Sequence, residues 1–129
     1  MGTAVITSCK KNEDEPSKSA MVVGSWTKSF DAEDGNNNKT LDASERVAVT
    51  GGDTEVSKFN ADGTGTVTLT GTVSGTLPFN WKLINNETDL RVDLGILGAD
   101  TSRIHTLTAT EFIIEDVDGT DYSWTGYKK

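Results

Sequence analysis

Cysteine and histidine are almost missing from this 129-residue chain, which has one of each. A single cysteine excludes a disulfide within the chain. The sequence also lacks a Gly-x-Ser-x-Gly elbow, a His-Glu-x-x-His helix and a glycine-rich phosphate loop, which are common motifs of catalytic sites. We therefore predict no catalytic residues and a protein that is not an enzyme. Carboxylates are numerous, so their number does not exclude a pair of catalytic carboxylates of the glycosidase type.

Positive charge and apolar residues are scarce as well. Lys and Arg number 12 against 20 Asp and Glu, so the formal net charge is -8. Such a charge repels the phosphates of nucleic acids and the head groups of anionic lipids, and it attracts cations. We expect no nucleic-acid partner. The hydrophobic fraction of 34% and the length of the chain indicate one domain with a thin core.

The first 20 residues differ in character from the rest. Residues 4–9, Ala-Val-Ile-Thr-Ser-Cys, resemble the end of a bacterial lipobox, in which an aliphatic and two small residues precede the cysteine that is acylated. Residues 1–3 carry no basic region, so we interpret residues 1–20 as a residual lipoprotein signal with Cys9 as the lipidation site, followed by a disordered tether. The alternative is a free thiol in a soluble tail.

An acidic cluster, residues 13–15, follows Cys9 closely. It resembles the sorting signals of lipoproteins that reach the outer face of a Gram-negative cell. We expect an outer-membrane lipoprotein of the cell envelope, exposed at the surface and held to the membrane only by its N-terminal lipid anchor. An ordinary soluble linker is the alternative for this segment. We expect the protein to be a monomer.

Residues 21–129 alternate between apolar and polar residues with a period of two, which is typical of antiparallel strands. Two neighbouring apolar series are Leu77, Phe79, Trp81 and Leu83, then Leu90, Val92, Leu94 and Ile96, with a turn at residues 85–87 between them. Asp62-Gly63 and Asp118-Gly119 predict two further hairpins. With strands at 22–30 and 102–109, we predict about eight strands in one all-β domain. The pattern leaves open whether they form a sandwich or a closed up-and-down barrel.

Four short motifs occur in an order that resembles the lipocalin-like domains of bacterial envelope lipoproteins. They are Gly24-Ser25-Trp26, Phe59-Asn60-Ala61-Asp62-Gly63-Thr64, Phe79-Asn80-Trp81-Lys82-Leu83 and Leu107-Thr108-Ala109-Thr110. The resemblance covers most of residues 21–129. It implies an eight-stranded antiparallel up-and-down barrel, with Trp26 closing one end near a basic residue at the end of the last strand.

A barrel of this family can enclose a small hydrophobic ligand. The aromatic residues that we expect around such a ligand are Trp26, Phe79, Trp81 and Trp124. The chain is short for a lipocalin, so the same residues could instead fill the interior as core.

Oxygen-bearing side chains stand at nearly every other position between residues 34 and 45. They follow the ligand order of an EF-hand loop: Asp34, Asn36, Asn38, Thr40, Asp42 and Glu45. Ca²⁺ binds six to eight oxygens, and a final glutamate can supply two of them. We therefore predict a Ca²⁺ cofactor in this loop. Lys39 replaces the usual glycine, at a cost of about 1 kcal/mol for a left-handed backbone.

The same stretch contains a simpler signal. Asp42-Ala43-Ser44-Glu45 is a capping box, which predicts a short helix through Val47 and Ala48 that ends at Gly51-Gly52 without any metal. The capping box does not explain the oxygens before it, so both interpretations can hold together. A second cation site at Asp116, Asp118 and Asp121 competes with an ordinary hairpin turn at the same residues.

These observations lead to a membrane-tethered, non-catalytic, lipocalin-like binding module, stabilised by Ca²⁺ in its first loop and holding a small hydrophobic ligand. The alternative is recognition of a glycan or a protein partner, for example an inhibited enzyme, through loops on a barrel with a filled interior. The interior volume separates the two, because a ligand pocket measures about 300 Å³ or more.

Overall fold

The computed structural model describes residues 17–49 and 52–129. The proposed lipobox, Cys9 and the acidic cluster lie outside these residues. The short helix α2 (Lys18–Val22) precedes nine strands: β1 (Gly24–Glu33), β2 (Arg46–Ala48), β3 (Thr54–Phe59), β4 (Thr64–Thr70), β5 (Gly75–Ile84), β6 (Asp89–Asp93), β7 (Ala99–Leu107), β8 (Glu111–Asp118) and β9 (Asp121–Lys128). Among the described residues, no helix has the length and apolar character needed to cross a membrane.

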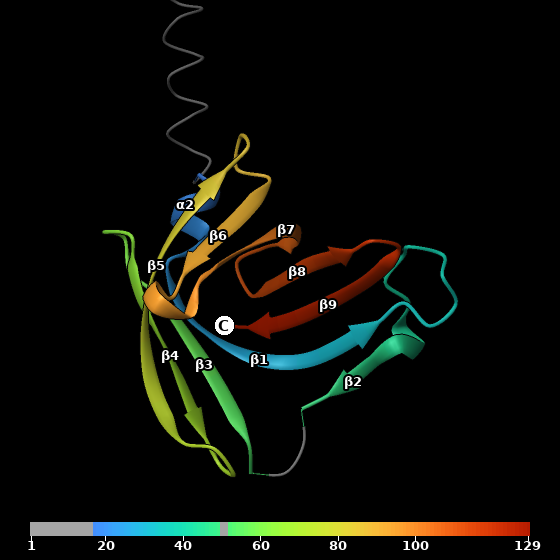
Figure 1. Cartoon of the computed structure of the whole chain (residues 1–129), viewed down its shortest axis with the longest axis horizontal. Coiled ribbons are helices and arrows are strands. Elements are labelled where there is room, and N and C mark those ends of the chain that lie inside the picture. The colour runs from blue at the N-terminus through green and yellow to red at the C-terminus, as the bar shows by residue number, and fades with distance from the viewer. Residues whose placement is uncertain (1–16, 50–51) are drawn as a thin grey trace, which may run out of the picture.

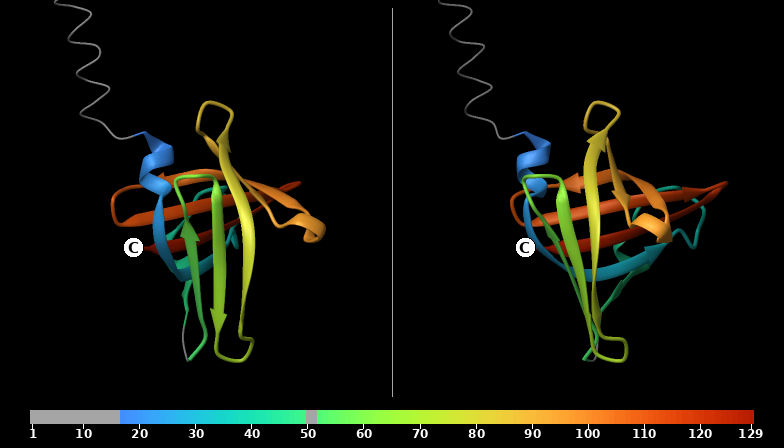
Figure 2. Two further views of the ribbon diagram at one scale, coloured as in Figure 1. Left: turned by 90° about the vertical axis from the view of Figure 1, so that its left-hand side faces the viewer. Right: turned by 60° about the vertical axis from the view of Figure 1, so that its left-hand side comes forward.

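Eight of the strands form a closed antiparallel barrel (Figure 1). Strands β3 to β9 pair in chain order, β1 pairs with β3 at one edge, and β9 returns to β1. The ninth strand, β2, pairs with residues 30–32 of β1 beyond the point where β3 leaves it. The predicted all-β, eight-stranded up-and-down barrel is therefore confirmed. In Figure 2, β3, β4 and β5 run side by side and cross the direction of β8 and β9 steeply.

The turns form where the sequence predicts them. Asn85, Asn86 and Glu87 all have positive φ values between β5 and β6. Gly63 and Gly119 have φ values of 90° and 65° at the other two hairpins, a region that costs glycine little. Beside Gly63, the hydroxyl and main-chain N–H of Thr64 donate to the Asp62 carboxylate, which lowers the pKa of Asp62 below its usual value.

Residues 18–22, expected as the end of the tether and the start of the first strand, form helix α2, and β1 begins at Gly24. Two further segments differ from their predicted structure. The helix after the first loop is only a 3₁₀ turn, Ala43–Glu45, and Val47 and Ala48 belong to β2. Beyond Thr27, β3 no longer pairs with its edge of β1. A strand at residues 46–48 can hydrogen-bond to the free main-chain groups of that edge, which a helix could not do. The apolar series after Leu90 also ends early, because β6 stops at Asp93 and Ile96 lies in a second 3₁₀ turn, Gly95–Leu97.

The barrel interior holds the larger of two apolar clusters, which we call the inner cluster. Its buried members come from α2 and five strands: Val22, Trp26, Phe59, Phe79, Trp81, Leu90 and Phe112. Strand pairing explains the set, because directly paired residues share one face of a sheet and Phe59 pairs with Gly65, which pairs with Phe79. The missing side chain at Gly65 leaves room for the Phe79 ring.

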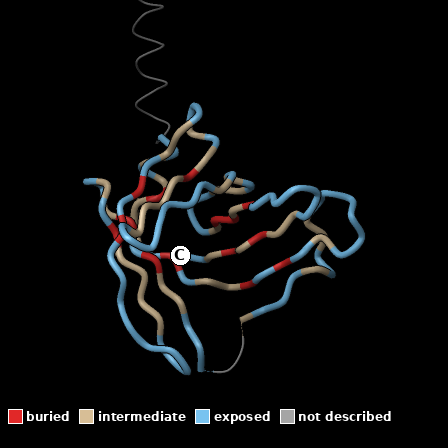
Figure 3. Tube along the Cα trace, viewed as in Figure 1, coloured by how far each residue is buried: buried red, intermediate tan, exposed pale blue. Residues whose placement is uncertain are grey.

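A second apolar cluster, the outer cluster, lies on the opposite face of β1, β8 and β9. It consists of Phe30, Ala32, Ile113 and Trp124, with Leu41 and Tyr122 packed against it. Irregular pairing between Lys28 and Phe30 marks a bulge in β1. The extra residue inverts the alternation, so Trp26 faces inward whereas Phe30 faces outward. Figure 3 shows buried segments along β1 and β9, which pair with each other.

Candidate functional site

The interior of the barrel is divided into a filled end and an open end. At the filled end, the rings of Phe59, Phe79 and Trp81 are in edge contact, with centroids 5.2 and 5.4 Å from that of Phe59. Helix α2 lies beside the same end, where Ser19 donates to the Glu87 carboxylate of the β5–β6 turn. This half of the interior is therefore closed and packed.

The open end carries polar and charged groups on inward-facing positions. Lys28 forms an ion pair with Asp31 at 2.9 Å, and the Tyr127 hydroxyl donates to Glu55 at 3.2 Å. Burial, together with the nearby negative charge of Glu55, raises the pKa of the Tyr127 hydroxyl well above its ordinary value. Since this phenol stays protonated at neutral pH, it can donate the observed hydrogen bond.

Two pockets open from the interior at this end. One, of about 350 Å³, is lined by Leu90, Val92, Asp100, Ser102, Ile114 and Asp116. The other, of about 330 Å³, lies between β1, β3 and β4 and includes Lys28, Asp31, Glu55 and Leu69 in its lining. Both combine aliphatic side chains with carboxylates, so both suit a ligand with an apolar and a polar part.

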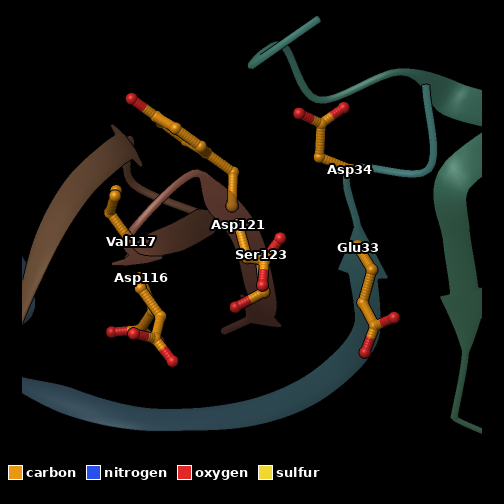
Figure 4. Close-up of a pocket in the computed structure, with 8 residues that line it drawn as sticks. Glu33, Asp34, Asp116, Val117, Asp121 and Ser123 are labelled. Atoms are coloured by element: carbon orange, nitrogen blue, oxygen red, sulfur yellow. The ribbon is translucent and has the colours of Figure 1, made fainter. Parts of the chain in front are cut away.

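A third pocket, of about 470 Å³, lies where the first loop meets the β8–β9 hairpin. It is lined by Glu33, Asp34, Asp116, Val117, Asp118, Asp121, Tyr122 and Ser123. The contact is fixed by the main chain, because the Asp34 N–H donates to the Tyr122 carbonyl at 3.0 Å. Figure 4 shows the carboxylates of Glu33 and Asp34 pointing in opposite directions, so the acids of this pocket do not converge on one point.

The first loop brings its oxygen-bearing side chains together. The Asp34 carboxylate accepts the N–H groups of Asn38 at 3.1 Å and Lys39 at 2.8 Å. The Asn38 side-chain oxygen accepts the Thr40 N–H at 3.0 Å. Lys39 has a φ of 61°, so the left-handed conformation expected at this position is present. These bonds curl the chain around Asp34 at the start of the loop.

The end of the loop closes against its start. The Glu45 carboxylate accepts the Gly35 N–H at 2.9 Å and the Asp42 N–H at 3.0 Å, the second bond being one arm of the predicted capping box. The side-chain amides of Asn36 and Asn38 both donate to one Asp42 oxygen at 2.9 Å. All six predicted ligands therefore lie within one hydrogen-bonded loop.

Carboxylates alone do not build a metal centre here. Within residues 17–49 and 52–129, no group of three or more His, Cys, Asp or Glu side chains is arranged to hold a metal ion. A cation in the first loop would therefore need the amide, hydroxyl or main-chain oxygens of Asn36, Asn38 and Thr40 beside the carboxylates. Each of these oxygens has a second lone pair available after accepting one hydrogen bond.

The four aromatic residues expected around a ligand are separated by the sheet. Trp26, Phe79 and Trp81 belong to the inner cluster, whereas Trp124 belongs to the outer cluster. The Trp124 indole N–H donates to the buried carboxylate of Glu115 at 2.9 Å. The first three residues pack as core at the filled end, and none of the four lines either of the two pockets at the open end.

The chain matches no model of a protein family, and no curated protein is similar enough in sequence to count as a relative. The geometry of the interior and of the first loop is thus the basis for any assignment of function.

Sequence patterns did not identify several residues at the open end of the barrel. Asp31, Glu55 and Asp100 line its pockets, but none of them belongs to a recognisable sequence motif. The signal that could have identified Glu55 is the alternation of β3, where Glu55, Ser57 and Phe59 share one face. For Asp31 the bulge in β1 hides that signal.

Proposed function

We propose that this protein is a non-catalytic, lipocalin-like binding module of the bacterial cell envelope, tethered by lipidation at Cys9. The position of Lys129 supports the lipocalin-like resemblance, because its ammonium group lies 4.7 Å from the centre of the Trp26 ring at the filled end of the barrel. Tethering and location depend on the sequence of residues 1–20.

The observation that carries the binding function is the 350 Å³ interior pocket. Its floor of Leu90, Val92 and Ile114 suits a short alkyl chain, and its carboxylates, Asp100 and Asp116, suit a cationic or hydroxyl-rich head group. The ligand class is therefore a small amphipathic molecule rather than a purely hydrophobic one. The packed aromatic rings form the base of the barrel beneath it.

Matched amphiphiles test this function. Calorimetric titration below the micellar concentration would compare octyltrimethylammonium, octyl glucoside and octyl sulfate, which share one alkyl chain. We expect the cationic compound to bind, and the Asp100→Asn/Asp116→Asn variant to lose at least tenfold in affinity. Asp62→Asn, at an exposed hairpin, is the matched control. Equal affinity for all three head groups would contradict the proposed role of the carboxylates.

We propose further that the first loop binds Ca²⁺ through Asp34, Asn36, Asn38, Thr40, Asp42 and Glu45. Support comes from the left-handed Lys39 and from the enclosure of Asp34 by main-chain N–H groups, which orient its oxygens. Leu41 points the other way and packs on the outer cluster, so the loop has one polar and one apolar side. Bound Ca²⁺ would replace the hydrogen bonds that now join Asp42 to the two asparagine amides.

Calorimetric titration with Ca²⁺ tests the loop separately from the pocket. We expect a dissociation constant of about 10⁻⁴ to 10⁻³ M. Glu45→Gln should weaken binding at least tenfold, whereas Lys39→Gly should strengthen it, because glycine accepts a positive φ and the substitution removes a positive charge. Asp118→Asn is the control for the hairpin acids. No heat of binding at millimolar Ca²⁺ would contradict this part of the proposal.

A second candidate function is recognition of a glycan or a protein, for example an inhibited enzyme, through the loops. It is favoured by the packed aromatic half of the interior and by the pocket of about 470 Å³ between the first loop and the β8–β9 hairpin. Native mass spectrometry of the purified chain separates the candidates. A co-purified small amphiphile supports the interior pocket, and its absence together with binding to glycans favours the loops.

A further inference from the structure

Two basic side chains face each other on the outer wall of the barrel, where β5 pairs with β6 (Figure 1). Lys82 lies directly opposite Arg91 in the register of this pair. Both alternate with residues of the inner cluster, such as Trp81 and Leu90, so their side chains point away from the interior. Directly opposed residues of an antiparallel pair have Cβ atoms about 5 Å apart, and like charges in these positions repel each other.

No ion pair relieves this repulsion. Neither Lys82 nor Arg91 forms one with any residue that the structure describes. The acids diagonally across from Lys82 have other partners, because Asp89 accepts the side-chain amide of Asn85 at 2.6 Å and Asp93 accepts a main-chain N–H at 2.8 Å. Arg91 is also half-buried, which raises the cost of leaving its charge without a partner. An anion bound between the two side chains would remove both costs.

The two cations share a pocket, which we call the basic pocket. It measures about 310 Å³ and is also lined by Asn80, Trp81 and Asp93. A neighbouring hollow of about 260 Å³ has Asn80 and Asp93 in its lining as well, together with the apolar residues Pro78 and Leu94. One oxygen of Asp93 is not used by the main chain and can accept a bond from a hydroxyl group, and the Asn80 amide can donate or accept one. The surroundings of the two cations therefore suit a ring that carries hydroxyl groups.

We propose that the basic pocket binds a sugar carboxylate, such as a uronate. Its carboxylate group would lie between Lys82 and Arg91, since a guanidinium group can form two parallel hydrogen bonds with a carboxylate. Two cations and one carboxylate give the lining a net charge of +1, which matches a carboxylate better than a phosphate ester with a charge of about -1.5 to -2. This site on the barrel wall is separate from the interior pocket and from the first loop, and it depends on neither.

Titration of the isotope-labelled chain with glucuronate, followed by NMR, tests the proposal. We expect the main-chain signals of residues 80–82 and 91–93 to shift. Lys82→Gln/Arg91→Gln should lower the affinity by about tenfold or more. The matched control is Lys58→Gln/Lys128→Gln, which removes the same charge at two exposed lysines on other strands and should bind like the original chain. Circular dichroism would establish that each variant is folded.

Three related compounds provide the second arm. Glucose lacks the carboxylate, acetate lacks the hydroxylated ring and glucose phosphate carries a larger charge, so each should bind more weakly than glucuronate. Added salt should weaken the binding of glucuronate, because the pocket is open to solvent. The proposal is overturned if glucuronate shifts none of these signals, if the double glutamine variant binds equally well, or if any of the three compounds binds as tightly as glucuronate.

Discussion

The ammonium group of Lys129 lies 4.7 Å from the centre of the Trp26 ring and donates a hydrogen bond to the Val23 carbonyl at 2.8 Å. The indole N–H of Trp26 donates to the Val22 carbonyl, also at 2.8 Å. These contacts join the residue after β9 to the beginning of β1 and to the end of α2. They close the filled end of the barrel on the side opposite its pockets.

Replacement of Lys129 by alanine should lower the free energy of unfolding by about 1 kcal/mol, since the cation lies at the surface of the ring and one hydrogen bond is lost. Lys129→Arg should retain much of this stability. Lys128→Ala, at the exposed neighbouring residue, is the control. Urea unfolding followed by fluorescence measures all three, and equal stability of the two alanine variants would refute the contact.

Gly126, the one glycine of β9, should not tolerate a larger residue. A methyl group at this position would overlap the Phe30 ring, which lies directly across the β1–β9 pair. We expect Gly126→Ala to cost about 3 kcal/mol of stability through overpacking. Gly52→Ala is the matched control, because nothing lies within 4 Å of a methyl group there.

A double-mutant cycle makes the Gly126 prediction specific. Because the clash is with Phe30, the Gly126→Ala/Phe30→Ala variant should lose less stability than the two single variants lose together. Additive losses in thermal or urea unfolding would show that the ring is not the cause.

Glu115 should be needed for the outer cluster. Its side chain is 7% exposed and accepts hydrogen bonds from the Trp124 indole at 2.9 Å and from Arg103 at 3.2 Å. Glu115→Ala leaves the buried indole N–H without an acceptor, which should cost about 1–3 kcal/mol. Glu115→Gln keeps an acceptor and should cost less. Both are compared by urea unfolding with Asp118→Ala, at an exposed acid of the same strand, which should change stability little.

Tyr127 should make the protein sensitive to alkaline pH. The pKa of Tyr127 in the folded protein is raised, mainly by burial and then by Glu55, so above pH 10 the unfolded chain loses a proton that the folded protein keeps. Stability therefore falls as the pH rises beyond about 10, by as much as 1.4 kcal/mol per pH unit from this group. Tyr127→Phe should remove that part of the slope between pH 9 and 11.

Glu55→Gln provides the second arm of the pH experiment. It removes the charge but not the burial, so it should reduce the alkaline slope only in part. Urea unfolding at several pH values measures the slopes. A Tyr127→Phe variant with the same slope as the original chain would contradict the assignment.

Local sequence signals predicted most of the barrel strands and their turns. Asp62-Gly63, Asp118-Gly119 and residues 85–87 form hairpins because their backbones tolerate positive φ values, which is a property of the residues themselves. The six oxygens of the first loop also form one local group, since they lie within twelve consecutive residues. The sequence could not show that this loop lies against the β8–β9 hairpin, which is distant in the chain.

The failures have a common cause in contacts between distant residues. The capping box favoured a helix through Val47 and Ala48, but an unpaired edge of β1 made the strand β2 more favourable. The alternation around Trp26 could not reveal the bulge before Phe30, which turns Phe30 and Ala32 to the outside and Asp31 to the inside. Trp124 was assigned to the interior although it packs in the outer cluster, because alternation along β9 does not say which of its two faces turns inward.

The sequence by itself determined that the chain forms antiparallel strands with tight turns, because period-two alternation and turn residues act over a few neighbours. Closure of the sheet between β1 and β9, the separation into inner and outer clusters, and the acidic pockets at the open end were decided only in three dimensions. They depend on which strand edges meet and on single-residue bulges, and these are settled when the whole sheet closes and buries its side chains.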